Sequence, residues 1–466
     1  MKKFLLFFSI LLFAVYSCSD DDGIVVGSTS VSFSVPSVNL VDEVTDIEVA
    51  FSQPTTSSGT LTLGVTETEA SYGEDYTTNP AGTEKTLEIP FEAGVSKVVF
   101  KFNKLIPAIE GQVKNVKFTI NAVSTNYVIS GNTSLVANFN ETALSGNSLE
   151  PEVGGPSQVN QVYIDLSSGV MTTVPRTSWD LGFHSGSEFR VILNNSVKMS
   201  AKSLESTDLT AAVSEDNAML IGQGAGNVSQ IDNPTGLITG TAIAEVSAND
   251  EENFVYLVNL GSNPSLNPPA LGSVSADSGT HRGWKKIKIL RNGNGYKLQY
   301  ADLSATTFNE VIIDKNSAFN FTFFSFTTNT TVNVEPQKDK WDINFTTFTN
   351  IVGGTIPYFY PDFVVNNSRG GALVYSVSTN DFSYENFSFA NVDNSKFIED
   401  QRGIGFSWRG TSTTGPDGMP VSQFVLKTDI FYILKDTAGN FYKIKMTEGA
   451  LPNLERGHPT FVYEML

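Results

Sequence analysis

The chain has 466 residues, and 49 aspartate and glutamate residues outnumber 30 lysine and arginine residues, which gives a formal net charge of −19. A chain this acidic repels nucleic acids and anionic lipid surfaces, which argues against nucleic-acid binding. The 40% hydrophobic content is ample for large cores, and no long segment has apolar residues at helical spacing. Short alternating runs separated by turn residues predict an all-β protein.

Residues 1–17 predict a signal peptide, because two lysines precede an apolar stretch that is too short to span a membrane. Cys18 follows directly and is the only cysteine, so the exported body has no disulfide. This order resembles a bacterial lipoprotein signal, which implies lipidation of Cys18; an ordinary signal peptide is the alternative. The acidic tether at 18–28 resembles surface-export signals of Bacteroidetes lipoproteins. We therefore expect a lipid-anchored outer-membrane protein that faces the outside.

Residues 29–142 read as about seven short strands at regular spacing, which is typical of a two-sheet β-sandwich. SYGEDYTT at 71–78, followed by LEIPFEAGVSKVVFKF at 87–102, resembles a Calx-β-type or related immunoglobulin-like domain. That family often holds calcium with acidic side chains at one end of the sandwich. The acidic pair expected after the second segment is replaced by Asn-Lys, so a spacer domain without calcium is favoured. The carboxylates available for calcium are Glu74, Asp75 and Glu110.

Residues 143–158 form a linker rich in Gly, Pro, Ser and Asn, and a duplicated region follows it. Two segments, 159–303 (copy 1) and 304–466 (copy 2), carry similar motifs in the same order. Their offsets are about 149 for the I-D pair Asp165/Asp314, about 162 for the W-D pair and about 146 for the Y-K pair Tyr296/Tyr442. Matching order at similar offsets predicts a duplicated, largely antiparallel β module of about 150 residues.

The W-D motif is predicted to specify the fold rather than a catalytic site. Strand alternation places Trp179, Leu181 and Phe183 on one face, and copy 2 repeats the pattern. Each tryptophan is expected to anchor a core, and each aspartate to accept hydrogen bonds from backbone N–H groups. The motif residues are Trp179 and Asp180 in copy 1, and Trp341 and Asp342 in copy 2.

A further resemblance covers 159–466 and rests on an ordered set of motifs, each of them weak alone. They are SWDLGF, GWKKIKI with YKLQYADL, KDKWDINFTTF, DFVVNN with GGALVY, IGFSWRG, FYILKDTAGNFYKIKM and ERGHPTFVYEML. This set resembles the HmuY-like haemophore lipoproteins. The resemblance implies an all-β surface protein that binds haem through two axial His or Met side chains. It also implies that haem passes to a TonB-dependent receptor in the outer membrane.

Haem iron needs an imidazole nitrogen or a thioether sulfur inside an apolar pocket. Copy 1 has more such donors than copy 2 and is the better candidate for the pocket. The resemblance implies haem binding without placing the iron, so several axial ligands remain open. The candidates are His281 and Met219 as a pair, then Met199 and His184.

The sequence predicts a binding protein rather than an enzyme. It has no Gly-rich phosphate loop, no G-x-S-x-G elbow and no His pair at metal spacing. The alternative to haem capture is an adhesin or glycan-binding lipoprotein of a nutrient-uptake system. Aromatic side chains that could stack on a sugar or a porphyrin are Tyr358, Phe359, Tyr360 and Phe363.

Overall fold

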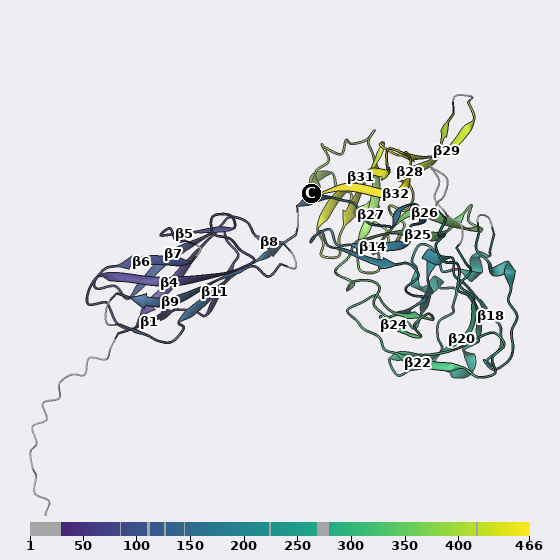
Figure 1. The fold of residues 1–466 in the computed structure, drawn as a ribbon, viewed down its shortest axis with the longest axis horizontal. Helices are drawn as coiled ribbons and strands as arrows, with labels where there is room; N and C mark the ends of the chain where they lie inside the picture. The colour runs from purple at the N-terminus through teal and green to yellow at the C-terminus, as the bar shows by residue number, and fades with distance from the viewer. Residues whose placement is uncertain are drawn as a thin grey trace, which may run out of the picture. The chain divides into compact units, whose positions relative to one another are not determined.

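The computed structural model describes residues 29–466 except 84, 110–111, 125–126, 144, 223–224, 268–278 and 416–417. The chain divides into two compact units, Met1–Glu141 and Thr142–Leu466. The predicted all-β fold is confirmed, because the described residues form strands and only three-residue 3-10 turns (Figure 1). None of these turns is long and apolar enough to cross a membrane. The predicted signal peptide, Cys18 and Glu110 lie outside the described residues.

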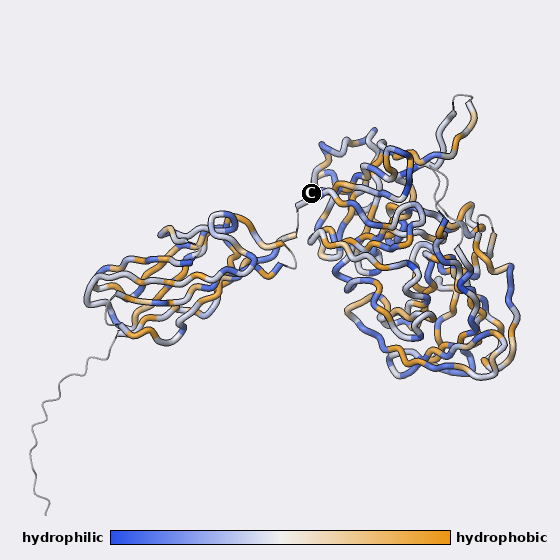
Figure 2. The backbone as a smooth tube through the Cα atoms, viewed as in Figure 1, coloured by the Kyte–Doolittle hydropathy of each residue, from blue (hydrophilic) through white to orange (hydrophobic). Residues whose placement is uncertain are grey.

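Unit 1 contains two five-stranded sheets that enclose one apolar core. Alternation along the strands builds this core: Phe100 and Phe102 are buried whereas Lys101 between them is exposed, and Figure 2 shows the same alternation along neighbouring strands. One sheet has the order β10 (Val128–Ile129), β1 (Ser30–Phe33), β3 (Val44–Phe51), β7 (Lys97–Lys104) and β5 (Tyr76–Asn79). The other has the order β2 (Ser37–Leu40), β11 (Ser134–Phe139), β9 (Asn115–Val123), β4 (Gly59–Thr68) and β6 (Thr86–Phe91).

Unit 2 contains two five-stranded sheets, here named outer sheet A and outer sheet B. Outer sheet A has the order β13 (Gly146–Leu149), β32 (Arg456–Met465), β31 (Phe441–Ala450), β30 (Ile430–Lys435) and β27 (Leu373–Ser378). Outer sheet B has the order β18 (Ser200–Ser203), β19 (Tyr256–Asn259), β20 (Trp284–Asn292), β21 (Gly295–Ala301) and β22 (Asn309–Ile313). A separate hairpin consists of β28 (Arg409–Thr414) and β29 (Pro420–Leu426).

Two four-stranded sheets, here named inner sheet A and inner sheet B, lie between the outer sheets. Inner sheet A has the order β15 (Met171–Pro175), β14 (Asn160–Ile164), β25 (Ile343–Val352) and β26 (Ile356–Asn366). Inner sheet B has the order β17 (Val191–Leu193), β16 (Leu181–His184), β23 (Phe321–Ser325) and β24 (Thr330–Val332). Separate apolar clusters join outer sheet A to inner sheet A and outer sheet B to inner sheet B. A third cluster, with both W-D tryptophans, joins the two inner sheets.

Each inner sheet is built from both predicted copies. The β14–β15 hairpin of copy 1 pairs with β25 of copy 2, and β23 of copy 2 pairs with β16 of copy 1. Outer sheet B is shared in the same way, because β22 of copy 2 pairs with β21 of copy 1. Outer sheet A takes its edge strand from the segment predicted as a linker, because β13 lies within 143–158 and pairs with β32. The two copies therefore interlock through exchanged strands.

The structure shows which residues occupy equivalent positions in the two copies, and it corrects two of the three predicted motif matches, the I-D and the Y-K match. The N–H of Asp180 donates to the carbonyl of Phe324, and the N–H of Asp342 donates to the carbonyl of Ile164. Ile164 and Phe324 are therefore equivalent, so the predicted partner of Asp165 was wrong: it is Ser325 rather than Asp314.

The predicted pairing of the two Y-K motifs was also wrong, because the matching residues lie one strand apart in the outer sheets. Lys286 and Lys443 are both buried and lie opposite Leu257 and Ile433, respectively, at matching places in the outer sheets. The WKKIKI segment therefore matches FYKIKM, and Tyr442 does not correspond to Tyr296. The error arose because neighbouring strands of one hairpin carry similar alternating patterns.

Candidate functional site

The W-D motif fixes the inner sheets through the same hydrogen bonds in both copies. Asp180 Oδ2 accepts from the N–H of Phe326 at 2.6 Å, and Asp342 Oδ2 accepts from the N–H of Leu166 at 2.9 Å. Each aspartate therefore binds the first inner strand of the other copy. An asparagine supports each turn: Asn194 donates to the carbonyls of Arg176 and Trp179, and Asn367 to those of Lys338 and Trp341.

The predicted faces of the W-D strand need one correction. Trp179 lies in the cluster between the inner sheets, whereas Leu181 and Phe183 face outer sheet B. The reason is that β16 begins at Leu181, so the alternation does not extend back to Trp179. Trp179 packs edge-on against Phe323 with ring centroids 4.7 Å apart, and Trp341 packs against Tyr163 at 5.0 Å.

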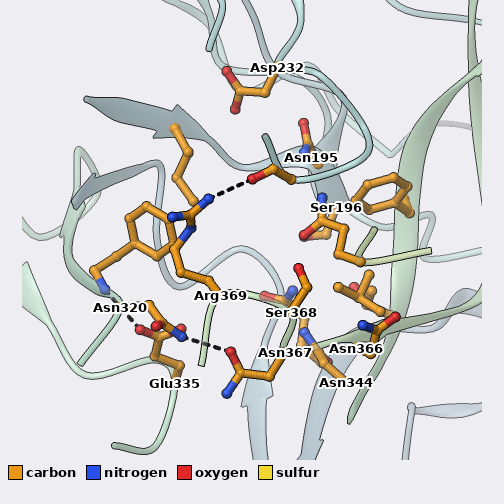
Figure 3. A pocket seen from close by; sticks show the side chains of 18 of the residues that line it. Asn195, Ser196, Asp232, Asn320, Glu335, Asn344, Asn366, Asn367, Ser368 and Arg369 are labelled. Carbon is orange, nitrogen blue, oxygen red and sulfur yellow. Dashed lines mark hydrogen bonds between the residues drawn. The ribbon is translucent and has the colours of Figure 1, made fainter. Parts of the chain in front are cut away.

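A cavity of about 130 Å³ lies between the inner sheets and is lined by both W-D tryptophans. Aromatic and aliphatic side chains form part of its wall, and amide, hydroxyl and charged side chains form the rest (Figure 3). The lining side chains come from both copies because the sheets are shared. Exposed Leu237 and Arg369 lie where the cavity meets solvent, and Arg369 donates to the carbonyl of Gly236 at 2.9 Å.

Two buried carboxyl groups line this cavity. Burial raises the pKa of Glu335 to about 8, although Glu335 Oε1 accepts from the N–H of Phe321 at 2.9 Å. Burial likewise raises the pKa of Asp232 to about 7, although two backbone N–H groups donate to it. Near pH 7 Glu335 is therefore mostly protonated and Asp232 is about half protonated, so the interior carries less negative charge than two ionised carboxylates would. The guanidinium of Arg369 at the mouth supplies positive charge.

His184 ends β16 and is buried beside the aromatic ring of Phe321, with ring centroids 5.6 Å apart. Its Nδ1 lies 3.4 Å from the carbonyl of Glu188, which fits a neutral ring that carries its proton on Nδ1. Burial and then the charge of Arg369 lower the pKa of His184, so the ring is neutral near pH 7. Within the described residues, no hydrogen bond to Nε2 is found.

His281 and Met219 both lie near the side chain of Asn259. His281 Nε2 lies 2.8 Å from Asn259 Oδ1, and Asn259 Nδ2 donates to the carbonyl of Met219 at 3.3 Å. His281 Nδ1 also accepts from the N–H of Gly283 at 3.1 Å, so both ring nitrogens are engaged. The side chain of Met219 is fully buried beside Leu257 and Trp284, and Met199 is fully buried in the core between inner and outer sheets B.

The remaining candidate residues lie apart from the cavity. In unit 1, Asp75 forms an ion pair with Lys114 at 2.8 Å, and Glu74 is exposed. Among the described residues, no three His, Cys, Asp or Glu side chains converge in a way that could hold a metal ion. Of the aromatic side chains in β26, Phe359 and Phe363 are buried and Tyr358 and Tyr360 are half-buried.

Four stacked antiparallel sheets around a cavity define a β-structured binding unit. The profile of the HmuY protein family matches residues 157–274 and 317–463, together more than half of the chain. The chain therefore belongs to the HmuY family, as the motif set predicted. No curated protein matches the chain.

Similar solved structures include the apo-form Calx CBD1 domain, at 10% identity and a TM-score of 0.20, over 24% of this chain and 96% of that chain. CBD12 from CALX1.2 matches at 8% identity and a TM-score of 0.20, over 31% and 75% of the two chains. A two-domain protein with unknown function from Bacteroides fragilis matches at 11% identity and a TM-score of 0.19, over 71% and 93%. These TM-scores are too low to support an inference about this protein.

Sequence reasoning missed the polar side chains of the cavity, although a signal for them exists. In the register that the structure defines, Asn344 stands where copy 1 has Gly182, and Arg369 stands where copy 1 has Ser196. A comparison of the copies in this register would have identified both as departures from a shared pattern.

Proposed function

We propose that this protein is a surface lipoprotein, anchored through Cys18, that captures haem or a related porphyrin and passes it to an outer-membrane receptor. Membership of the HmuY family, whose members are surface-associated haem-binding lipoproteins, carries this proposal. The protein makes no covalent change to its ligand. Its interlocked sheets supply a rigid frame on which an axial ligand can be held.

His184 is the axial ligand that the geometry supports best among the four candidates. A neutral imidazole whose Nδ1–H faces a backbone carbonyl presents its Nε2 lone pair to a metal. His281 would have to give up an existing hydrogen bond in order to bind iron, because both of its nitrogens are engaged. Met199 and Met219 would require the core around their fully buried side chains to open.

A groove that is lined by Phe321, the ring that packs against His184, has a size that suits a large planar ligand. Its volume is about 640 Å³, within the roughly 300–1,000 Å³ that is typical of ligand pockets. Phe319, Phe321 and Lys315 line it, and Phe321 also contacts the His184 ring. Rotation of the half-buried Phe321 would connect the groove to Nε2, and Lys315 could pair with a propionate.

The test is a haemin titration of the mature chain, residues 19–466, followed by difference absorbance in the oxidised and reduced states. We expect a saturable shift of the Soret band that is lost in His184→Ala and kept in His281→Ala. Loss only in His281→Ala would transfer the role of axial ligand to His281. A flat, non-saturating response of the unmodified chain would contradict haem binding.

Glycan binding is the second candidate, and one exposed aromatic pair favours it. Tyr360 and Phe406 stack with ring centroids 4.4 Å apart, and Phe406 is 38% exposed. Asp400, Arg402 and Asn350 line the adjoining hollow and offer polar groups for sugar hydroxyls. Glycan-array binding that is lost in Phe406→Ala would support this function.

A further inference from the structure

The cavity between the inner sheets contains buried polar groups without protein partners. Trp341 and Asn344 are 7% and 5% exposed, respectively, and neither Trp341 Nε1 nor Asn344 Oδ1 has a hydrogen-bond partner within the described part of the chain. Asn195 Oδ1 on the same wall is also buried without a partner. A buried polar group without a partner costs about 1–3 kcal/mol, so three of them around one cavity indicate that something else satisfies them.

Comparison of the copies explains why Trp341 and Asn344 of copy 2 are unpaired. Trp179 Nε1 donates to Gln161 Oε1 at 2.9 Å, but the residue equivalent to Gln161 in copy 2 is Phe321, which cannot accept a hydrogen bond. At the equivalent of Asn344, copy 1 has Gly182, where an added Cβ would lie only 2.7 Å from Ile192 Cγ1. At these two positions copy 1 is closed or paired, whereas copy 2 presents unpaired polar groups within the described residues; Asn195 Oδ1 is an unpaired group from copy 1.

The cation at the mouth points to an anionic ligand. Arg369 replaces Ser196 of copy 1. Glu188 and Glu399 lie close enough to act on its charge, but none of the ion pairs found among the described residues includes Arg369. One of its donors is used by the carbonyl of Gly236, which leaves others for an incoming acceptor. Figure 3 shows the Arg369 side chain among the amide and hydroxyl groups that line the cavity.

We infer that this cavity binds a small hydroxylated carboxylate about the size of a single uronic acid. The carboxylate would pair with Arg369 at the mouth, where charge-assisted bonds to a guanidinium are strong. The ligand hydroxyls would donate to Asn344 and Asn195 and accept from Trp341 Nε1. The tryptophan rings and Phe348 supply apolar surface for the C–H face of a pyranose ring.

The volume of the cavity is large enough for one such ligand. A water molecule needs about 10–15 Å³ of such space, so a cavity of about 130 Å³ holds roughly ten water-sized groups. One pyranose ring with its substituents fits these bounds, whereas a porphyrin does not. The cavity has no His or Met among its lining residues, so it offers no axial ligand for haem iron. It adjoins the groove proposed for haem, because Phe321, Phe323 and Glu335 line both.

Isothermal titration calorimetry of the chain 19–466 with D-glucuronate and D-galacturonate, against neutral D-glucose, tests the inference. We expect saturable binding of at least one uronate that is at least tenfold tighter than that of glucose. Arg369→Gln should weaken uronate binding at least tenfold and leave glucose unchanged. Asn344→Ala should weaken it several-fold, and the same change at the exposed, distant Asn147 should have no effect.

Circular dichroism would verify that each variant is folded, and Asn344→Ala removes a side chain whose Oδ1 has no partner within the described part of the chain. Equal binding of uronates and glucose, unchanged affinity in Arg369→Gln, or no binding of either uronate would overturn the inference. An oligosaccharide that ends in a uronate serves as a further probe: tighter binding than the monosaccharide would indicate that the natural ligand is a glycan terminus. A Soret titration reports the haem site separately, so failure of one proposal is distinguishable from failure of the other.

Discussion

The two W-D motifs share one backbone geometry and differ in chemistry. Asp180 is buried in an ion pair with Arg282 at 2.7 Å. Among the residues that the structure describes, Asp342 accepts only from backbone N–H groups and forms no ion pair. Burial, with smaller contributions from Asp436 and Asp165, raises the pKa of Asp342 to about 8. The difference shows that the motif needs a hydrogen-bond acceptor at this position, while the charge of that acceptor depends on its copy.

The largest difference is expected when the two aspartates are replaced. Asp180→Ala would leave Arg282 buried without its counter-charge and should lower the free energy of unfolding by about 3–5 kcal/mol. Asp342→Asn should not destabilise unit 2 at pH 7, because the folded side chain is mostly uncharged, an amide oxygen still accepts from Leu166, and the unfolded state no longer gains from ionising this residue. All four tryptophans of the chain lie in unit 2, so denaturant unfolding followed by tryptophan fluorescence measures this unit. Equal costs would contradict the comparison.

The pH dependence of stability should come mainly from Asp342 and the two cavity carboxyls, although burial also raises the pKa of Asp180. The pKa of Asp342 is about 8 in the folded state and about 3.9 when unfolded, so the folded state retains a proton that the unfolded state releases between these values. The free energy of unfolding therefore falls as pH rises from 4 to 8, by up to about 1.4 kcal/mol per pH unit for this group. Asp342→Asn and Glu335→Gln should each flatten the profile. If neither substitution changes the dependence of the unfolding free energy on pH, these two carboxyl groups are not its source.

Gly182 and Asn344 should respond in opposite ways to alanine. Gly182→Ala places a Cβ 2.7 Å from Ile192 and should destabilise unit 2 by about 1–3 kcal/mol. Asn344→Ala removes an amide without protein partners and should change stability by less than about 0.5 kcal/mol. Thermal unfolding of both variants checks this pair; a destabilised Asn344→Ala would indicate that its amide has a structural role.

The smallest difference is expected between the two tryptophans. Trp179→Phe removes the hydrogen bond to Gln161, whereas Trp341→Phe removes an N–H that has no partner. Both changes reduce ring size alike, so Trp179→Phe should cost about 1 kcal/mol more than Trp341→Phe. Denaturant unfolding at equal pH, with Trp284 and Trp408 as reporters, measures this difference. A larger loss in Trp341→Phe would reverse the comparison.

Alternation and motif order were sufficient to predict the all-β class, the duplication and the HmuY family. The strand exchange was not predictable, because β14 and β23 carry similar apolar patterns and either could pair with β16 or β25 on local grounds. The cavity was missed for a related reason. Its amides and hydroxyls, such as Asn195 and Ser368, occur in segments that resemble turns, and only long-range pairing brings them to one place.

The exchange of strands also governs how the molecule folds. The first strand of unit 2, β13, pairs with its last, β32, and Gly146 and Glu464 lie more than 300 positions apart along the chain. Contacts this distant in sequence make folding slow, because the entropy of closing a large loop is lost before the paired strands contribute any stabilisation. Copy 1 cannot complete its sheets until copy 2 is available. A chain stopped near residue 303 would therefore expose unpaired strand edges and be prone to aggregate.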